Sequence, residues 1–259
     1  MNFSEKLPAF ANPQGAAGKL LIASMNIFHT PVSLWGISHL DLAGNEKILD
    51  IGCGGGINLS RFLKKVPRGH VTGIDLSPDC VNYSFMRNRD AIAEGRCSVY
   101  EGSAELLPFG ANHFDVITAF ETIYFWPNLP NTLKEIKRVL KPGGTFIIMD
   151  VMSPGHPVRN IWLQTVEALR DTSHVQNYAS GEWLSLITEA GLIARALITD
   201  RLPLEFSSWI ARMRTPEVLS QAIRLYQESA SAEVKAYFEL QDDGSFTSDT
   251  IMAEAQKAG

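Results

Sequence analysis

Short strand-like runs alternate with helix-like runs between about residues 46 and 150 of this 259-residue chain. The strand-like runs are rich in β-branched or aromatic residues and read KILDIG (47–52), HVTGIDL (70–76), SVYEGS (98–103), FDVITAF (114–120) and GTFIIMD (144–150). The segments between them carry apolar residues at helical spacing, as at Leu133, Ile136 and Val139. This alternation predicts an α/β fold in which helices cover both faces of a parallel sheet.

Ligands of open parallel sheets bind beyond the carboxyl ends of the strands. In the predicted sheet, that edge carries Gly52–Gly56, Asp75, Ser103 and Phe120–Trp126. The glycine-rich sequence at 142–144 is predicted only to stop a helix and to turn the chain into the fifth strand. The functional site is therefore expected at the carboxyl ends of the strands, and the glycines at 143–144 are not expected to belong to it.

The flanks of this region have a different pattern. Helices are predicted around residues 18–28 and 34–40, across 157–192 and across 205–241, with a further strand at 193–200. We therefore predict three parts, which are an N-terminal helical cap at 1–45, a core at 46–200, and a helical insertion with the last strand at 201–259. Four of the five tryptophans lie in the flanks, at Trp35, Trp162, Trp183 and Trp209. Such helices are expected to form a lid over the strand ends, although they would serve equally to complete the hydrophobic core.

Composition excludes several classes of partner. Apolar residues make up 45% and charged residues 20% of the chain, so a packed core is expected. The net charge of −5 argues against general binding to nucleic acid or to an anionic membrane, because either needs a basic face. Cys53, Cys80 and Cys97 form neither a disulfide framework nor a zinc motif. With no secretory leader or membrane-length apolar run, we expect a cytoplasmic monomer or homodimer without stable membrane association.

The run ILDIGCGGG (48–56) places bare backbone at the end of the first strand. Its glycines fall at Gly52, Gly54 and Gly56, whereas Ile57 occupies the last glycine position of the dinucleotide pattern G-x-G-x-x-G. A P-loop is excluded because G-K-[ST] is missing. Asp50, at the strand end, suits a ligand with an amino group rather than a pyrophosphate.

Asp75 ends the next strand, in VTGIDLS. A carboxylate at this position can accept both hydrogen bonds from a ribose diol. Capping of the following helix is the alternative role, but Ser77 and Asp79 are better placed for it. Taken alone, the glycine loop and this acid leave a nicotinamide-dependent enzyme open.

The ordered set ILDIGCGGG, VTGIDLS, EGSAELLPF with FDVITAF, and RVLKPGGTFIIMD resembles the class I S-adenosylmethionine-dependent methyltransferases of the bacterial small-molecule type. The resemblance covers about residues 46–150. It implies a Rossmann-like seven-stranded, mostly parallel sheet with helical N-terminal and C-terminal lid segments, S-adenosylmethionine as cofactor, and a small-molecule methyl acceptor. A nicotinamide-dependent oxidoreductase is disfavoured by Ile57 and by the lack of Tyr-x-x-x-Lys. A non-catalytic S-adenosylmethionine-binding protein is the other alternative.

The same resemblance implies which residues bind the cofactor. Those beside its methionine part are Gly52, Gly54 and Gly56, with Cys53 in the same loop and Asp50 below it. Asp75 is implied to hold the ribose hydroxyls, and Leu76 to pack on the adenine. The residues implied to meet the adenine edge are Ser103, Ala104 and Glu105, where many relatives carry Asp in place of the serine. The backbone at Phe120 and Glu121 is implied to receive the cofactor's ammonium group.

The acceptor site is less defined, and the sequence assigns no catalytic residue and no metal ligand. Residues 121–128 follow the fourth strand and border the place where methyl group and acceptor meet, so Tyr124 and Trp126 are expected to line an acceptor pocket. Either Phe125 or Trp126 is instead expected in the core. The candidate histidines are His29, His156 and His174, with an ordinary surface or packing role as the alternative for each. Arg212 and Arg214 are candidates for holding an acidic substrate, or else solvated helix residues.

Overall fold

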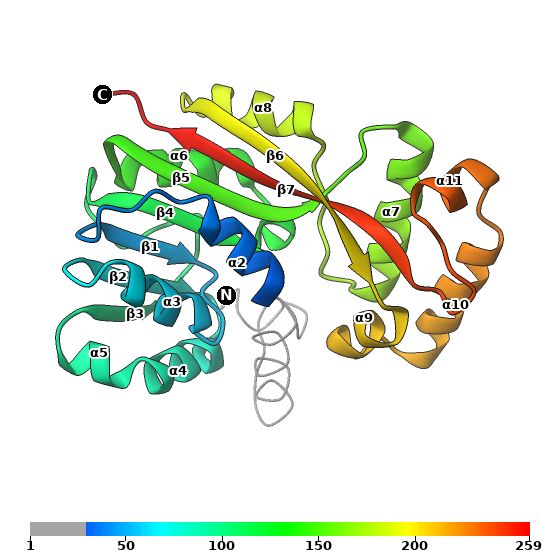
Figure 1. The fold of residues 1–259 in the computed structure, drawn as a ribbon, viewed down its shortest axis with the longest axis horizontal. Coiled ribbons are helices and arrows are strands. Elements are labelled where there is room, and N and C mark those ends of the chain that lie inside the picture. The colour runs from blue at the N-terminus through cyan, green and yellow to red at the C-terminus, as the bar shows by residue number, and fades with distance from the viewer. Residues whose placement is uncertain (1–29) are drawn as a thin grey trace.

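A computed structural model of the protein describes residues 30–259 (Figure 1). The helix predicted around residues 18–28 and the candidate His29 lie outside the described residues. The second predicted N-terminal helix is present as α2 (Thr30–Ser38). It contacts the fifth strand of the sheet, and Gly36 allows the close approach, because a Cβ there would meet the Phe120 ring at 3.3 Å.

Seven strands form one sheet in the order β3-β2-β1-β4-β5-β7-β6. Their bounds are β1 (Lys47–Ile51), β2 (His70–Asp75), β3 (Cys97–Glu101), β4 (Phe114–Phe120), β5 (Leu140–Met152), β6 (Ile193–Leu204) and β7 (Phe246–Gln256). The first five strands pair in parallel, whereas β7 runs antiparallel to both β5 and β6. The predicted Rossmann-like, mostly parallel seven-stranded sheet is confirmed.

Most strand boundaries lie within about two residues of those predicted, but the start of β5 and the end of β6 differ by more. Strand β5 begins at Leu140 instead of Gly144, and its register with β4 jumps from Leu140 to Thr145, so the predicted turn is a bulge inside the strand. Gly143 has φ 76° in that bulge, a conformation that glycine adopts at little cost. Strand β6 extends past residue 200 to Leu204, because β7 is long enough to pair with it as far as Phe246.

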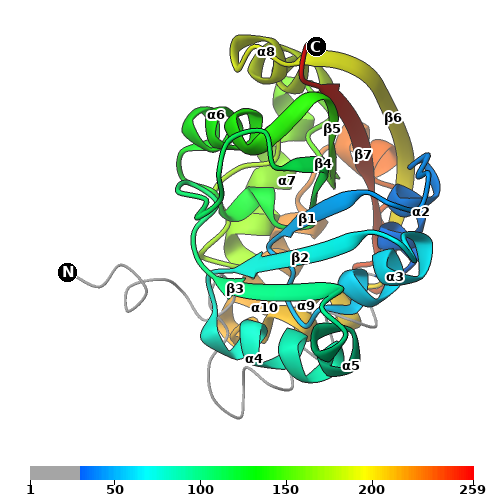
Figure 2. The same ribbon diagram turned by 90° about the vertical axis from the view of Figure 1, so that its left-hand side faces the viewer.

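Helices cover both faces of the sheet (Figure 2). The remaining α-helices of the core are α3 (Ile57–Lys65), α4 (Pro78–Arg87), α5 (Arg89–Ala93), α6 (Leu129–Val139) and α8 (Ser180–Glu189), and the 3₁₀ helix η2 (Ile123–Phe125) follows β4. One face packs against α2 and α3 through residues such as Ile37 and Phe62, and the other packs against α6 and α8 through residues such as Leu133 and Trp183. The carboxyl ends of β1, β2 and β4 are thereby held in fixed register.

A second group of helices lies beyond the end of the parallel sheet (Figure 1). It consists of α7 (Pro157–Arg170), α9 (Phe206–Met213), α10 (Glu217–Glu228) and α11 (Ala232–Tyr237), of which the last three connect β6 to β7. These four helices, called the helical lobe below, share a hydrophobic cluster that includes Trp162, Trp209 and Phe246. Trp162 and Trp209 therefore complete the core of the lobe, and Trp183 completes the core of the sheet.

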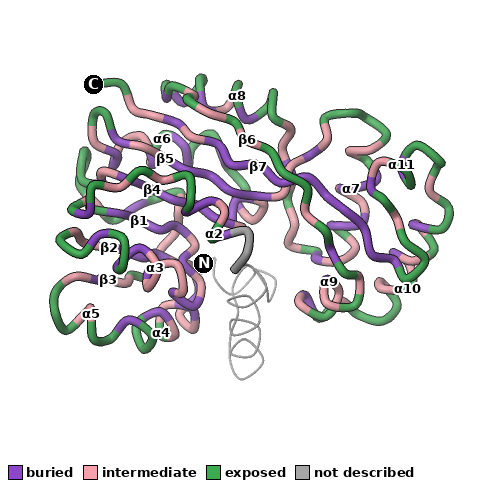
Figure 3. Tube along the Cα trace, in the orientation of Figure 1, coloured by how far each residue is buried: buried purple, intermediate pink, exposed green. Residues whose placement is uncertain are grey.

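Burial follows the sheet into the helical lobe, because both β7 and the inner side of α7 are largely buried (Figure 3). Of the helices found in residues 30–259, none has both the length and the apolar character needed to cross a membrane. Several polar side chains near the strand ends, such as Asp50, Thr118 and Asp150, are also buried.

Candidate active site at the carboxyl ends of the strands

The glycine loop folds from the end of β1 over the end of β2. The backbone N–H groups of Gly52 and Cys53 both donate to the Ile74 carbonyl oxygen, at 2.8 and 3.1 Å. Gly52, Gly54 and Gly56 have φ values of 71°, 52° and 72°, in the left-handed region that favours glycine. The loop therefore depends on glycine at three alternate positions.

The three glycines face different surroundings. A Cβ on Gly52 would lie 2.3 Å from Thr122 Oγ1, and one on Gly56 would lie 2.4 Å from Ser84 Oγ. Around Gly54, in contrast, no described atom outside the adjoining residues lies within 4 Å of the position of a Cβ. Gly52 and Gly56 are thus required by packing within the protein, and of the three glycines only Gly54 presents bare backbone to space that no neighbouring element of the described protein fills.

Asp75 is half-buried at the end of β2 and fastens the glycine loop. Its Oδ2 accepts a hydrogen bond from Gly54 N–H at 2.8 Å, and its Oδ1 accepts one from Ser77 N–H at 2.9 Å. Burial raises the pKa of this carboxyl above its ordinary value. An ionised carboxylate has about four lone-pair positions, so both oxygens keep the capacity to accept from ribose hydroxyls. The predicted helix cap is Ser77, whose Oγ accepts from Cys80 N–H at 3.3 Å.

Asp50 lies under the loop with only 2% of its surface exposed. Its Oδ1 accepts a hydrogen bond from Thr118 Oγ1 at 2.7 Å. Burial, and to a lesser degree the charge of Asp75, raise the pKa of Asp50 to about 7, although the hydrogen bond from Thr118 lowers it. A cation placed nearby would favour ionisation of this carboxyl, as expected for a partner of an ammonium group.

The other residues implied to bind the cofactor surround this loop. Leu76 is half-buried beside Asp75, and Cys53 is buried with its Sγ 3.5 Å from Ser84 Oγ. Ser103 follows β3, and its Oγ accepts a hydrogen bond from the backbone N–H of exposed Glu105 at 3.2 Å. Ala104 packs against the hydrophobic core of the sheet. Phe120 packs on Phe62, so its side chain belongs to the other face of the core.

Glu121 begins the segment after β4 in a strained conformation. Its φ is 53°, which is uncommon for a residue with a side chain and costs on the order of 1–3 kcal/mol. The bend is held by the Glu121 N–H, which donates to the Met149 carbonyl oxygen at 2.9 Å. The Oε1 atom of Glu121 is shielded from solvent and has no hydrogen-bond partner within residues 30–259. An acceptor of this kind is costly to bury, so the position is a candidate for function.

Two arginines of the helical lobe face Glu121. Arg212 comes from α9 and Arg170 from the end of α7, and both charges favour the ionised form of the glutamate. Burial nevertheless dominates and raises the pKa of Glu121 to about 7. Arg170 is itself held between Glu167, with Nη1 to Oε2 at 3.3 Å, and the Trp209 ring, whose centroid lies 4.7 Å from its Cζ. The glutamate therefore lies where the sheet meets the lobe.

Tyr124 and His174 stack beside this cluster. Their ring centroids are 5.8 Å apart, and the Tyr124 carbonyl oxygen accepts a hydrogen bond from Val175 N–H at 2.8 Å. Burial raises the pKa of the Tyr124 hydroxyl well above its usual value, and burial lowers the pKa of His174. His174 Nε2 lies 3.1 Å from Gln164 Oε1, an acceptor, which assigns the proton to Nε2. Both rings are therefore uncharged near neutral pH.

Comparison with known proteins now identifies the family. Residues 49–148 match the methyltransferase domain family. The uncharacterized protein YafE of Escherichia coli (strain K12) is 66% identical over 158 residues, which cover 61% of this chain and 76% of that protein. The crystal structure of YcgJ from Bacillus subtilis superimposes with a TM-score of 0.79 at 27% identity and covers 89% of this chain and 99% of that chain. The chain belongs to the class I S-adenosylmethionine-dependent methyltransferases.

More distant relatives of this methyltransferase carry names that state an acceptor. A protein of Mycolicibacterium smegmatis named as a fatty-acid O-methyltransferase is 30% identical over 146 residues, which cover 56% of this chain and 50% of that protein. The resemblance drawn from the sequence is thereby confirmed at the level of family, and the methyltransferase activity with it.

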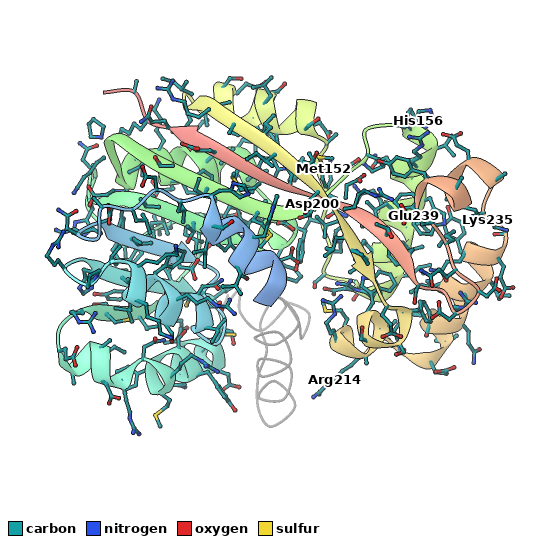
Figure 4. The ribbon with its side chains drawn as sticks, in the orientation of Figure 1. Met152, His156, Asp200, Arg214, Lys235 and Glu239 are labelled. Atoms are coloured by element: carbon teal, nitrogen blue, oxygen red, sulfur yellow. The ribbon has the colours of Figure 1, made fainter. Side chains whose placement is uncertain are left out.

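The structure does not bring all predicted acceptor residues together. Trp126 is 8% exposed and packs in the core of the sheet, in agreement with the alternative that either it or Phe125 is a core residue. His156 lies on the outer side of the helical lobe, where its Nδ1 is 3.5 Å from Glu233 Oε1 (Figure 4). Arg214 is exposed at the end of α9. Neither Trp126 nor His156 reaches the cluster around Glu121, because core packing and the turn into α7 direct them elsewhere.

Sequence reasoning missed the part that the lobe contributes. Arg170 was not a candidate, and Glu121 was singled out for its backbone alone, although a glutamate directly after β4 was a signal for its side chain as well. Groups of three or more His, Cys, Asp or Glu side chains that could hold a metal ion do not occur in the part of the chain that the structure describes.

Asp75→Asn is expected to weaken S-adenosylmethionine binding by about 1–3 kcal/mol, because one charge-assisted acceptor for the ribose is lost. Asparagine keeps the shape of the side chain and one acceptor for the loop N–H groups, so the variant tests the charge. Isothermal calorimetry measures the change. Asp79→Asn, four residues later on α4, is the matched control and is expected to bind normally. Unchanged affinity in a folded Asp75→Asn protein would remove Asp75 from the cofactor site.

Proposed function

We propose that this methyltransferase binds S-adenosylmethionine across the ends of β1, β2 and β4 and methylates a small-molecule acceptor. The observation that carries the proposal is the open face of the glycine loop at Gly54, fastened by Asp75 and backed by buried Asp50. When bound, the cofactor supplies a methyl group activated by the sulfonium charge. The residues of the protein then have to bind, orient and exclude water.

Each part of the site has a proposed role. Asp50 balances the ammonium charge of the cofactor, and Asp75 accepts from its ribose. Leu76 and residues 103–105 border its adenine. The acceptor is proposed to enter between the segment after β4 and the helical lobe, where Tyr124 and His174 offer uncharged aromatic surfaces.

A small molecule fits better than a polymer as acceptor. The chain has a net charge of −5, and the candidate site is bordered by the uncharged rings of Tyr124 and His174. A relative named for the O-methylation of fatty acids supports the same class. The proposal therefore concerns metabolites of the size that a site between sheet and lobe can enclose.

Two measurements test this function. Calorimetry with S-adenosylmethionine, S-adenosylhomocysteine and NAD should show binding of the first two only. Incubation with a bacterial metabolite extract and S-adenosylmethionine carrying a deuterated methyl group should then give labelled small molecules together with S-adenosylhomocysteine. Preferential NAD binding would contradict the cofactor, and cofactor binding without any labelled product would indicate a non-catalytic binding protein.

A further inference from the structure

We propose that Glu121 is the general base of this methyltransferase, and that the acceptor is a hydroxyl or amino compound whose proton Glu121 removes. The inference rests on the proposed function, and adds to it the chemical class of the acceptor atom and the group that activates it. A thiolate or a carbanion reacts without such a base, so the presence of one restricts the acceptor.

The position of Glu121 is the first part of the argument. Its neighbour Thr122 packs directly against Gly52 of the cofactor loop, since a Cβ on that glycine would lie 2.3 Å from Thr122 Oγ1. On its other side, Glu121 faces Arg212 and Arg170 of the helical lobe. The carboxyl group is thus next to the proposed cofactor site on one side and next to the charged residues of the helical lobe on the other.

The hydrogen bonds of the neighbouring carboxyls are the second part. Asp150, at the end of β5, accepts from Ile123 N–H at 3.1 Å through Oδ2 and from Val151 N–H at 2.8 Å through Oδ1. Both of its oxygens therefore hold the backbone in place, after β4 at Ile123 and near the end of β5 at Val151. Glu121 Oε1, in contrast, is buried and has no donor among residues 30–259. Of these two side chains, Glu121 is therefore the one with a carboxyl oxygen that the described fold does not use as a hydrogen-bond acceptor.

Strain at the same residue is the third part. The left-handed backbone of Glu121, with φ 53°, aims a charged side chain into the junction of sheet and lobe at a cost in stability. Glycine or asparagine would adopt that conformation more easily. The presence of glutamate at this position is explained if its carboxyl group has a task.

The charges around Glu121 suit proton transfer near neutral pH. Arg212 from α9 and Arg170 from α7 favour its ionised form, whereas burial and Glu167 from α7 disfavour it, and its pKa is raised to about 7. Asp150 from β5 and Tyr124 from the same segment also face it, and their own pKa values are raised well above the ordinary range. Neither Tyr124 nor Arg212 can act as a base there, whereas Glu121 can exchange a proton at working pH.

The proposed step balances in atoms and charge. The oxygen or nitrogen of the acceptor gives an electron pair to the methyl carbon, the sulfur–methyl bond breaks with its electrons on sulfur, and the acceptor's proton moves to Glu121 Oε1. The products are the methylated acceptor, S-adenosylhomocysteine and protonated Glu121, which then releases its proton to solvent. His174 is the competing base, because its Nδ1 keeps a lone pair while Nε2 is engaged by Gln164.

The first test needs no acceptor. The full-length protein, labelled with 13C at the glutamate side-chain carboxyl and saturated with S-adenosylhomocysteine, is titrated by NMR. One carboxyl resonance should titrate near the pKa of about 7 and should be missing from Glu121→Gln. If every glutamate titrates below about pH 5.5, close to the ordinary value, the proposal is overturned.

The second test measures methylation. With the metabolite extract and the deuterated methyl donor, product formation by the wild-type protein should rise as pH increases through about 7, because the base must be ionised. Glu121→Gln should lower the rate by about 10²–10⁴-fold with a flat pH profile. Its affinity for S-adenosylhomocysteine should stay within twofold, and Glu189→Gln, an exposed change on α8, should match the wild-type protein throughout.

Further variants separate catalysis from structure. Glu121→Gly relieves the positive φ, and added acetate should restore part of its lost activity by acting in the place of the carboxyl. The label should be found on oxygen or nitrogen of the product. The proposal would be overturned by label on sulfur or carbon, or by an activity of Glu121→Gln within fivefold of wild type. It would also be overturned if His174→Asn, instead of Glu121→Gln, had the flat pH profile. Failure to bind S-adenosylhomocysteine, or the absence of any labelled product, would instead refute the proposed function on which it rests.

Discussion

Gly54→Val is expected to abolish measurable binding of S-adenosylmethionine while the protein remains folded. Apart from the adjoining residues, no described atom lies within 4 Å of the position of a Cβ at Gly54, so the new Cβ contacts no other part of the described protein. It does fill the open space that the cofactor is proposed to occupy. The expected loss is more than about 3 kcal/mol, which is at least a hundredfold in Kd.

Backbone strain has to be separated from this steric effect. The φ of Gly54 is 52°, so valine there also costs roughly 1–2 kcal/mol of stability or more. Gly95→Val is the matched control, because Gly95 has φ 72° and likewise has nothing described within 4 Å of a Cβ, but precedes β3 at the other edge of the sheet. Both variants should lose similar stability in urea denaturation. Only Gly54→Val should lose cofactor binding in calorimetry, and equal binding by the two would show that the loop does not contact the cofactor.

The core of the fold could be predicted because its signals are local. Each parallel strand is a short apolar run between helical segments, and β4 was predicted with its observed bounds, Phe114–Phe120. Strand ends were predicted less well where glycine or antiparallel pairing intervened. The bulge at Gly143 hides the start of β5, and the extension of β6 to Leu204 depends on a partner strand that is far away in the chain.

The cofactor half of the site was also accessible from sequence, since its residues follow consecutive strands and must meet at one edge. The sequence could not show which of the three glycines is required by packing within the protein and which is free to contact a ligand. Gly52 and Gly56 are required by Thr122 and by Ser84 of α4, which are contacts made only in the folded chain. The resemblance treated all three as ligand contacts, whereas only Gly54 faces open space.

The acceptor half depends on long-range packing and was mostly missed. Arg170 and Arg212 lie on α7 and α9, which are separated in the chain by α8 and β6. Both arginines face Glu121 because β6 and β7 carry the lobe past the end of the parallel sheet (Figure 1). No local pattern distinguishes them from solvated helix arginines. Burial of Glu121, and with it the raised pKa, exists only after that assembly.

Asp50→Asn is expected to stabilise the protein above pH 7 and to weaken cofactor binding in the same molecule. The pKa of Asp50 is raised from 3.8 to about 7 by burial, so the folded state holds a proton that the unfolded chain releases over this range. The contribution of Asp50 to stability is therefore complete below about pH 4 and is lost as pH rises toward 7. Asparagine cannot ionise, and its Oδ1 can still accept from Thr118 Oγ1.

Urea denaturation at two pH values measures the first effect. Asp50→Asn should exceed the wild-type free energy of unfolding by on the order of 2–4 kcal/mol at pH 8, and the difference should vanish near pH 4. Thr118→Val, which removes the hydrogen-bond donor to Asp50, should instead destabilise the protein at pH 8 because it leaves the buried carboxylate without that bond.

Calorimetry at pH 8 measures the second effect, and S-adenosylmethionine should bind Asp50→Asn at least about tenfold more weakly, because its ammonium group loses a charged partner. A variant that is both more stable and an equally good binder would show that Asp50 is a buried acid of the fold without contact to the cofactor. A variant that is less stable at pH 8 would show that the carboxylate is already ionised and well solvated by the loop.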